Sequence, residues 1–102
     1  MPRKTHHIIL CCGANGRGVV YGEVSKKPVP GEPVTLRNAR MVLRWSTACG
    51  GLFGLAAMGP RGQPTDTRIT HAVAETTETV WREYIVVSPA AAQQFAAWSP
   101  VA

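Results

Sequence analysis

Three arginine residues lie close together near the middle of the chain, at Arg37, Arg40 and Arg44. A guanidinium group is planar and stays charged, and its fork of N–H donors matches the oxygens of phosphate and carboxylate groups. If a tight turn over residues 37–40 leads into a strand, Arg40 and Arg44 point to the same side of that strand. The spacing therefore predicts a site for an anionic ligand, with basic residues at Arg37, Arg40, Arg44, Lys26 and Lys27.

Two aromatic residues are candidates to complete such a site. Tyr21 and Trp81 could offer flat faces on which a base stacks, as aromatic side chains do in proteins that bind single strands. Arg17 could extend the basic surface. The alternative interpretation is that the arginines form a solvated outer face and that the aromatic rings belong to the core.

The charge balance agrees with an anionic partner. Eleven Lys and Arg residues against six Asp and Glu residues give a net charge of +5 at pH 7, and the isoelectric point is near 9.6. An excess of positive charge attracts nucleic acids, nucleotides and acidic protein surfaces. The basic residues do not form one block, so they are not a polybasic tail. A basic surface that serves only solubility is the alternative.

The residues His6, His7, Cys11 and Cys12 raise the question of a metal site, because imidazole and thiolate are the ligands that zinc prefers. On an extended strand His7 and Cys11 share a face but lie roughly 13 Å apart. Zinc ligands sit about 2 Å from the ion, so residues from elsewhere in the chain would have to complete the site. We predict no metal site, and thiols that are buried as small apolar side chains.

No motif for covalent or acid–base catalysis is present. A cysteine or serine can be combined on paper with His71 and Asp66 or Glu75, but the chain has no GxSxG or HExxH pattern. The glycine-rich run at residues 13–18 lacks the lysine and the following helix of a phosphate-binding loop, and it is predicted to be a hairpin turn. We therefore predict a non-enzymatic protein without a cofactor.

Short strands joined by turns should account for most of the chain. Ten glycines and eight prolines separate runs that are rich in Val, Thr, Ile and Arg, a pattern typical of β structure. The first run is apolar on both faces, which predicts a central strand. We expect strands within residues 4–13, 19–24, 34–36, 41–46, 68–73 and 78–89, a proline-rich loop at 25–33 and a polar loop at 61–67.

The strand at residues 41–46 is predicted to follow a tight polar corner at residues 37–40. Successive side chains of a strand point to opposite faces. Met41, Leu43 and Trp45 share one face and are expected to point to the core.

Two short helices are predicted. Residues 48–59 place Leu52, Leu55 and Ala56 at helical spacing and end in a Gly-Pro stop signal. The glycines in this segment leave a buried loop as the alternative. A second helix follows Ser88, whose side chain can cap it, with proline at the first helical position. Its buried stripe is expected to contain Ala92, Phe95 and Ala96, with Trp98 packing back on the sheet.

These elements predict a mainly β (α+β) fold, a small antiparallel curled sheet or partly open barrel with one or two short helices. A chain of 102 residues supports one core, so we expect one domain over residues 1–102. Exposed sheet edges favour a homo-oligomer. The odd number of cysteines and the short apolar run near the N-terminus indicate a cytosolic protein with reduced thiols and no membrane segment.

Residues 34–95 carry an ordered set of motifs. VTLRNARMVLRWS is followed by an apolar turn with GLFGLAAMGP, then by RITHAV and by a strand that ends in IVVSPAAAQQF. From about Gly18 onward this order resembles a widespread family of small uncharacterised phage and prophage proteins. The resemblance implies an origin in a phage or prophage genome rather than an activity. The shared features are Asn38-Ala39-Arg40, Trp45 and Leu55-Ala56.

The sequence therefore predicts a phage or prophage accessory protein that binds an anionic ligand in the host cytoplasm. Such a protein could inhibit host defence by sequestering a nucleotide signal or by blocking a defence protein. A virion or capsid-associated structural protein and a nucleic-acid-binding protein are the alternatives. Sequestration predicts a saturable site in a defined oligomer, nucleic-acid binding predicts an affinity that falls steeply with salt, and a structural role predicts neither.

Overall fold

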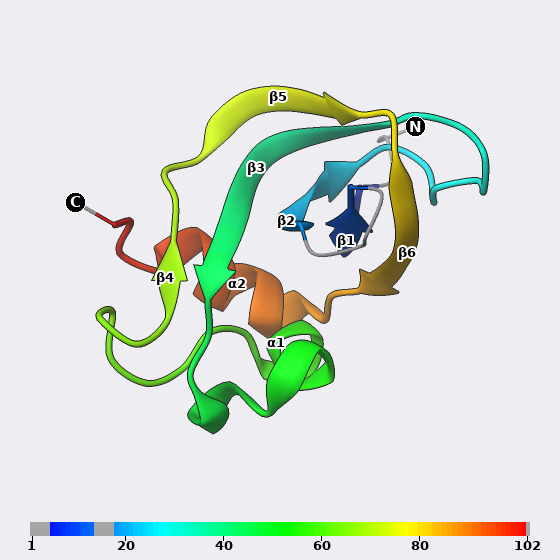
Figure 1. Ribbon diagram of the computed structural model, residues 1–102. Helices are drawn as coiled ribbons and strands as arrows, with labels where there is room; N and C mark the ends of the chain where they lie inside the picture. The colour runs from blue at the N-terminus through cyan, green and yellow to red at the C-terminus, as the bar shows by residue number, and fades with distance from the viewer. Residues whose placement is uncertain (1–4, 14–17, 102) are drawn as a thin grey trace.

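The computed structural model describes residues 5–13 and 18–101, so the predicted turn at residues 14–17, including Arg17, lies outside it. Six strands and two α-helices follow in the described part of the chain, with a short 3-10 helix before α1 (Figure 1). This confirms the mainly β fold with short helices. The bounds are β1 His6–Cys12, β2 Gly18–Val24, β3 Val34–Arg44, the 3-10 helix Thr47–Cys49, α1 Gly51–Met58, β4 Arg68–Ile69, β5 Val73–Glu78, β6 Trp81–Val86 and α2 Pro89–Ala97.

All strand pairs are antiparallel, and the sheet has the order β4-β3-β2-β1-β6, with β5 also paired to β3. β5 and β6 therefore lie at opposite edges of the sheet, although only Thr79 and Val80 separate them in the sequence. A sheet whose edges are joined by so short a link must curl, and Figure 1 shows the two strands meeting at one corner. The predicted curled sheet is confirmed, and it is not closed into a barrel.

Each face of the sheet carries a buried cluster. The helix face is the one that α1 and α2 cover, and its cluster consists of Ile9, Val19, Tyr21, Val42, Cys49, Leu55, Ala56, Ile69, Val87, Ala91, Ala92 and Phe95. The inner face lies on the opposite side, and its cluster consists of Ile8, Leu10, Cys12, Val20, Val24, Val34, Leu36 and Ala39. β1 contributes to both clusters because successive side chains alternate. Its predicted central position is confirmed.

β3 is one continuous strand, so the predicted corner between two strands is wrong. Tyr21 of β2 lies opposite Arg40, and Glu23 lies opposite Arg37, so β3 has one more residue than β2 between these pairs. This is the count of a β-bulge. Asn38 lies within it and adopts a φ of 49°, a left-handed conformation that asparagine tolerates better than most residues.

The bulge also reverses which residues of β3 face the core, because one extra residue moves every following side chain to the other face. Leu36 is buried on the inner face before the bulge, and Val42 is buried on the helix face after it. Met41 and Leu43 are 43% and 52% exposed. The predicted core side is therefore wrong for Met41 and Leu43, whereas Trp45 is half-buried and packs against the helix-face cluster.

The predicted strand at residues 68–73 is mostly wrong. β4 has only two residues, and Val73 is instead the first residue of β5. Between them, the hydroxyl of Thr70 accepts a hydrogen bond from the backbone N–H of Met41 at 2.9 Å. β3 is longer than either partner and is bent at its bulge, so β5 pairs with its first half and β4 with its second.

Both predicted helices are present. In α1 the glycine at position 54 is required by close packing, because a Cβ there would lie 1.8 Å from the carbonyl oxygen of Cys49. The helix ends at Gly59, which adopts a φ of 82°. In α2 the Ser88 hydroxyl caps the helix as predicted by accepting from the N–H of Ala91 at 3.1 Å.

The predicted buried stripe of α2 is confirmed for Ala92 and Phe95 and wrong for Ala96. The stripe consists of Ala91, Ala92 and Phe95, whereas Ala96 is exposed. Trp98 packs against the helix-face cluster, and its indole N–H donates to the carbonyl of Thr67 at 2.9 Å. The helix therefore lies on the sheet through its N-terminal turn and through Phe95.

Candidate functional site

Arg40, at the centre of the predicted basic site, is a buried structural residue. Only 5% of its surface is exposed. Its Nε donates to the carbonyl of Thr70 at 2.8 Å, and its Nη1 donates to the carbonyl of Phe95. Phe95 lies in the last turn of α2, where backbone carbonyls lack helical partners and a positive charge is favoured. Arg40 therefore ties β3 to α2 and to the chain before β5, and its donors face the protein rather than solvent.

Burial lowers the pKa of Arg40, and the nearby Tyr21 hydroxyl opposes that change. An arginine with a lowered pKa still remains charged near neutral pH. Its charge is met by carbonyl dipoles, since the one ion pair between described residues joins Arg37 to Glu75. The Asn38-Ala39-Arg40 motif thus has a structural role in this chain, with a bulge at Asn38, a buried Ala39 and a buried cation.

Tyr21 is also buried and does not offer a stacking surface to a ligand. Its ring is 4% exposed and stacks on Phe95, with centroids 4.3 Å apart and ring planes at 3°. Its hydroxyl lies 3.0 Å from Nδ1 of His7. Burial is the main reason that the pKa of Tyr21 rises to about 12, with a further contribution from Glu23. The face on which a base would stack is occupied by Phe95.

Trp81, the second predicted stacking residue, packs on the opposite face of the sheet from Tyr21. It is half-buried at the start of β6, and its indole N–H donates to the carbonyl of Glu32 at 2.7 Å. Its ring meets the ring of Tyr84 edge to face, at 6.3 Å. Trp81 therefore anchors the loop at residues 25–33 to the edge of the sheet, and it packs against the inner-face cluster, whereas Tyr21 lies in the helix-face cluster.

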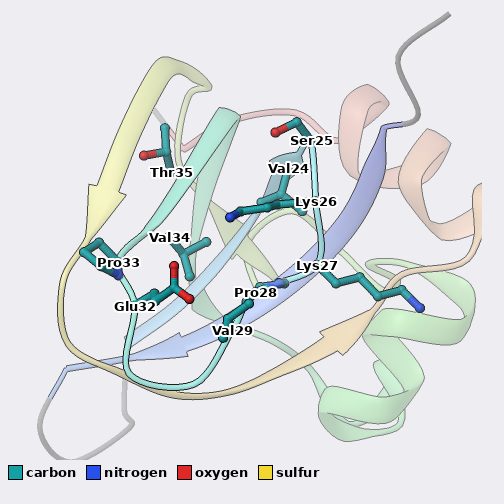
Figure 2. A pocket seen from close by; sticks show the side chains of 10 residues that line it. All are labelled: Val24, Ser25, Lys26, Lys27, Pro28, Val29, Glu32, Pro33, Val34 and Thr35. Carbon is teal, nitrogen blue, oxygen red and sulfur yellow. The ribbon is translucent and has the colours of Figure 1, made fainter. Parts of the chain in front are cut away.

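The loop at residues 25–33 lies over the inner face and encloses a hollow of about 160 Å³. Figure 2 shows that the Lys26 side chain extends over this hollow, while Lys27 extends away from it. The carboxylate of Glu32 also lies in the hollow (Figure 2). Both lysines line this hollow, but only the Lys26 side chain extends over it, together with the carboxylate of Glu32.

Arg37 lines a second hollow, of about 230 Å³, that shares Val24, Ser25 and Thr35 with the first. Its Nε lies 3.9 Å from the carboxylate of Glu75, and both side chains are largely exposed. Glu23 lines the same hollow and accepts a hydrogen bond from Asn38. Acidic groups therefore accompany Arg37 as they accompany Lys26, which offsets the attraction for an anion.

Arg44 lies at the far end of β3, where the register sets it opposite Arg68 of β4. Both residues are exposed. Like charges directly opposite in a sheet repel each other, and neither arginine forms an ion pair within the described part of the chain. This pair was missed in the sequence, because residues 44 and 68 are brought together only by the long-range pairing of β3 with β4.

The predicted basic residues thus fall into three places. Arg40 is buried under α2, and Arg44 lies at the β3–β4 end. The other three, Lys26, Lys27 and Arg37, lie in or near the loop at residues 25–33. The structure does not gather them into one site. The exposed residues remain candidates for an anion, and Arg44 with Arg68 is the pair that lacks acidic partners.

The three cysteines, Cys11, Cys12 and Cys49, are free and buried. Burial is the main cause that raises the pKa of the Cys11 and Cys12 thiols. Across residues 5–13 and 18–101, no group of three or more His, Cys, Asp or Glu side chains could hold a metal ion. In the same part of the chain, no helix has the length and apolar character needed to cross a membrane.

The six strands and two short helices form a small β-rich fold. Residues 5–98 match a family defined as a domain of unknown function (DUF6948), and the chain belongs to this family. The match begins just before β1 and ends just after α2, so it spans all the elements of the fold. The comparisons with curated proteins and with solved structures yield no match.

Proposed function

We propose that this protein is a non-enzymatic accessory protein of phage or prophage origin that binds an anionic ligand through Arg44 and Arg68. The observation that carries the proposal is their cross-strand position at the exposed end of β3. Like charges at partner positions of two paired strands repel each other, and a phosphate or carboxylate bound by both guanidinium groups would remove that repulsion. The net charge of +5 favours the approach of an anion to this surface.

A nucleotide signal of host defence is the ligand class that this proposal favours, and inhibition of host defence in the host cytoplasm is the role that follows. Sequestration needs a saturable site. A homo-oligomer would cover the free edge of the sheet at β6 and would present several such sites together.

The first test is native mass spectrometry of the full chain, as purified and after denaturation to release any bound small molecule. We expect a discrete oligomer that carries an anionic compound. The second test is titration with a fluorescent adenine nucleotide. The Arg44→Ala/Arg68→Ala variant should bind it at least about tenfold more weakly than the wild type, since hydrogen bonds to charged groups contribute about 1.5 to 3 kcal/mol each.

The matched control is Arg61→Ala/Arg82→Ala, which removes two positive charges from other exposed positions. If this control loses as much affinity as the Arg44→Ala/Arg68→Ala variant, net charge rather than a site governs binding. A single-stranded oligonucleotide measured over a salt series separates the nucleic-acid alternative, whose affinity should fall steeply with salt. A protein that binds neither probe would be better described by the virion-associated structural role.

A further inference from the structure

The inner face of the sheet has a third hollow, larger than those of about 160 and 230 Å³, that the anion-binding proposal does not use. It has a volume of about 550 Å³, within the usual range for binding sites. Val20 and Ala39 form its buried floor, and Met41 and Val73 at its rim are 43% and 51% exposed. Apolar side chains therefore dominate the hollow, and part of its wall is open to solvent.

β5 forms one wall of this hollow and also has a free edge. It pairs with β3 on one side, and no strand in the described part of the chain pairs with its other side. Residues opposite each other in a ladder share a face. Val73, Thr76 and Glu78 lie opposite Ala39, Leu36 and Val34, respectively, so they face the inner side. From Val73 to Glu78 this wall is roughly 17 Å long.

The free edge results from an unusual relation between β5 and β6. Two antiparallel strands joined by a two-residue link commonly pair as a hairpin. Here β5 and β6 meet at the corner near Thr79 and Val80 and then diverge (Figure 1). No ladder joins them across the described residues, so the curled sheet has an open seam between these two strands. A strand added to β5 would continue the sheet into this seam.

Glu78 gives the hollow a charge preference. The residue is half-buried and faces inward, and its carboxylate adds to the burial that raises the pKa of the Cys12 thiol. Glu78 has no cationic partner within the described part of the chain, where the ion pair joins Arg37 and Glu75. The two smaller hollows are lined by Lys26, Lys27 or Arg37 besides their glutamates, whereas the charged and titratable residues that line this hollow are Glu78 and His71, with no Lys or Arg.

We propose that an extended peptide segment of a partner protein adds to the free edge of β5, places apolar side chains in the hollow and sets a Lys or Arg beside Glu78. Strand addition of this kind takes its affinity from backbone hydrogen bonds and its specificity from alternate side chains. A second copy of β5 fits less well. Its sequence, VAETTE, contributes Glu75 and Glu78 but no cation, so self-pairing would bring carboxylates together.

The test selects peptides from a displayed library of random decapeptides on the immobilised full chain and then measures the affinity of the enriched sequences. We expect enriched peptides with apolar residues at every second position and at least one Lys or Arg. Glu78→Lys and Val73→Lys should each weaken binding by about tenfold or more, because one reverses the charge and the other places a charge in the apolar rim. N-methylation of alternate peptide amides should abolish binding, because it removes edge hydrogen bonds.

The matched controls are Glu83→Lys and Val86→Lys, both at exposed positions of β6. They should bind the peptides as the wild type does, and circular dichroism should show that all four variants are folded. The proposal is overturned if no sequence is enriched, or if the enriched peptides bind Glu78→Lys and Val73→Lys as well as they bind the wild type. It is also overturned if native mass spectrometry shows a dimer that Val73→Lys dissociates, since that result assigns the hollow to a second copy.

Discussion

The two faces of the sheet differ in whether their charged side chains are held by hydrogen bonds or ion pairs. On the helix face, the guanidinium group of Arg40 donates to the backbone carbonyls of Thr70 and Phe95. The ring of Phe95 also stacks on the ring of Tyr21. Hollows are found on both faces, since Tyr21 and Val87 of the helix-face cluster line one of about 580 Å³. On the inner face, however, Lys26 and Glu78 line hollows of about 160 and 550 Å³ without an ion pair in the described residues. The charged group on the helix face thus stabilises the fold, whereas those on the inner face are the ones on which the proposed peptide site depends.

The same comparison separates arginines that lie close together in the sequence. Arg37 and Arg40 are three residues apart, yet the first is largely exposed and the second is 5% exposed. The bulge at Asn38 lies between them and turns Arg40 toward α2. Arginine spacing alone therefore does not define a binding site, because the register of the strand decides which guanidinium groups reach solvent.

The largest difference in stability between substitutions at a buried and at an exposed position is expected for the two phenylalanines. Phe95→Ala removes a fully buried ring and its stack on Tyr21, and it should lower the free energy of unfolding by about 3 to 5 kcal/mol. Phe53→Ala, at a side chain that is 77% exposed, should change it by less than about 0.5 kcal/mol. Urea denaturation measures both. Equal effects would show that α2 does not depend on its contact with the helix face.

The next prediction compares the two arginines directly. Arg40→Ala leaves the carbonyls of Thr70 and Phe95 without their donor, and it should lower the free energy of unfolding by about 2 to 3 kcal/mol. Arg37→Ala removes an exposed ion pair with Glu75, whose contribution should be below about 1 kcal/mol. Chemical denaturation under identical conditions checks the difference. A stable Arg40→Ala variant that loses anion binding would reverse the structural role assigned to Arg40.

A third prediction tests how tightly the inner face is packed in the region between its hollows, where β2 lies against β3. A Cβ at Gly22 would lie 2.7 Å from Cβ of Leu36, so β2 and β3 would have to move apart. Gly22→Ala should therefore lower the free energy of unfolding by about 1 to 3 kcal/mol, the usual effect of overpacking. Thermal unfolding measures the change. A variant as stable as the wild type would show that the inner face is loosely packed throughout, rather than only at its hollows.

Much of the fold could be predicted because its signals are local. The doubly apolar run of β1, the prolines of the loop at residues 25–33 and the Ser88-Pro89 start of α2 each act within a few residues. The bulge at Asn38 could not be predicted from alternation, because the extra residue is defined only by the pairing of β3 with β2. The errors at Met41 and Leu43 follow from that bulge.

The candidate site was harder to predict for the same reason. Arg44 was identified, but its partner Arg68 belongs to a two-residue strand that is recognised only through its pairing with β3. The burial of Arg40 depends on the last turn of α2, which is 55 residues away in the sequence. Residue type suggested an anion site, and long-range register decided which side chains could take part.

The smallest expected effect concerns the pH dependence of the helix face. The pKa of Tyr21 is raised from its ordinary value of 10.0 to about 12, so the folded chain keeps the phenol protonated where the unfolded chain has lost the proton. This contribution to stability is complete below pH 10 and is lost as the pH rises toward 12. The pKa values of the Cys11 and Cys12 thiols are also raised from their ordinary value of 9.0, so they too lower the stability of the folded chain as the pH rises above 9.0.

Comparison with Tyr21→Phe isolates the contribution of the phenol. This variant keeps the stack on Phe95 but loses the hydrogen bond to His7, so it should be less stable at neutral pH by about 1 kcal/mol. Between pH 10 and 12 the wild type should lose stability faster than the variant, and the two curves should converge. Urea midpoints measured at each pH would show this. Parallel curves would mean that Tyr21 is hydrated in the folded chain, and the helix face would then be as open as the inner face.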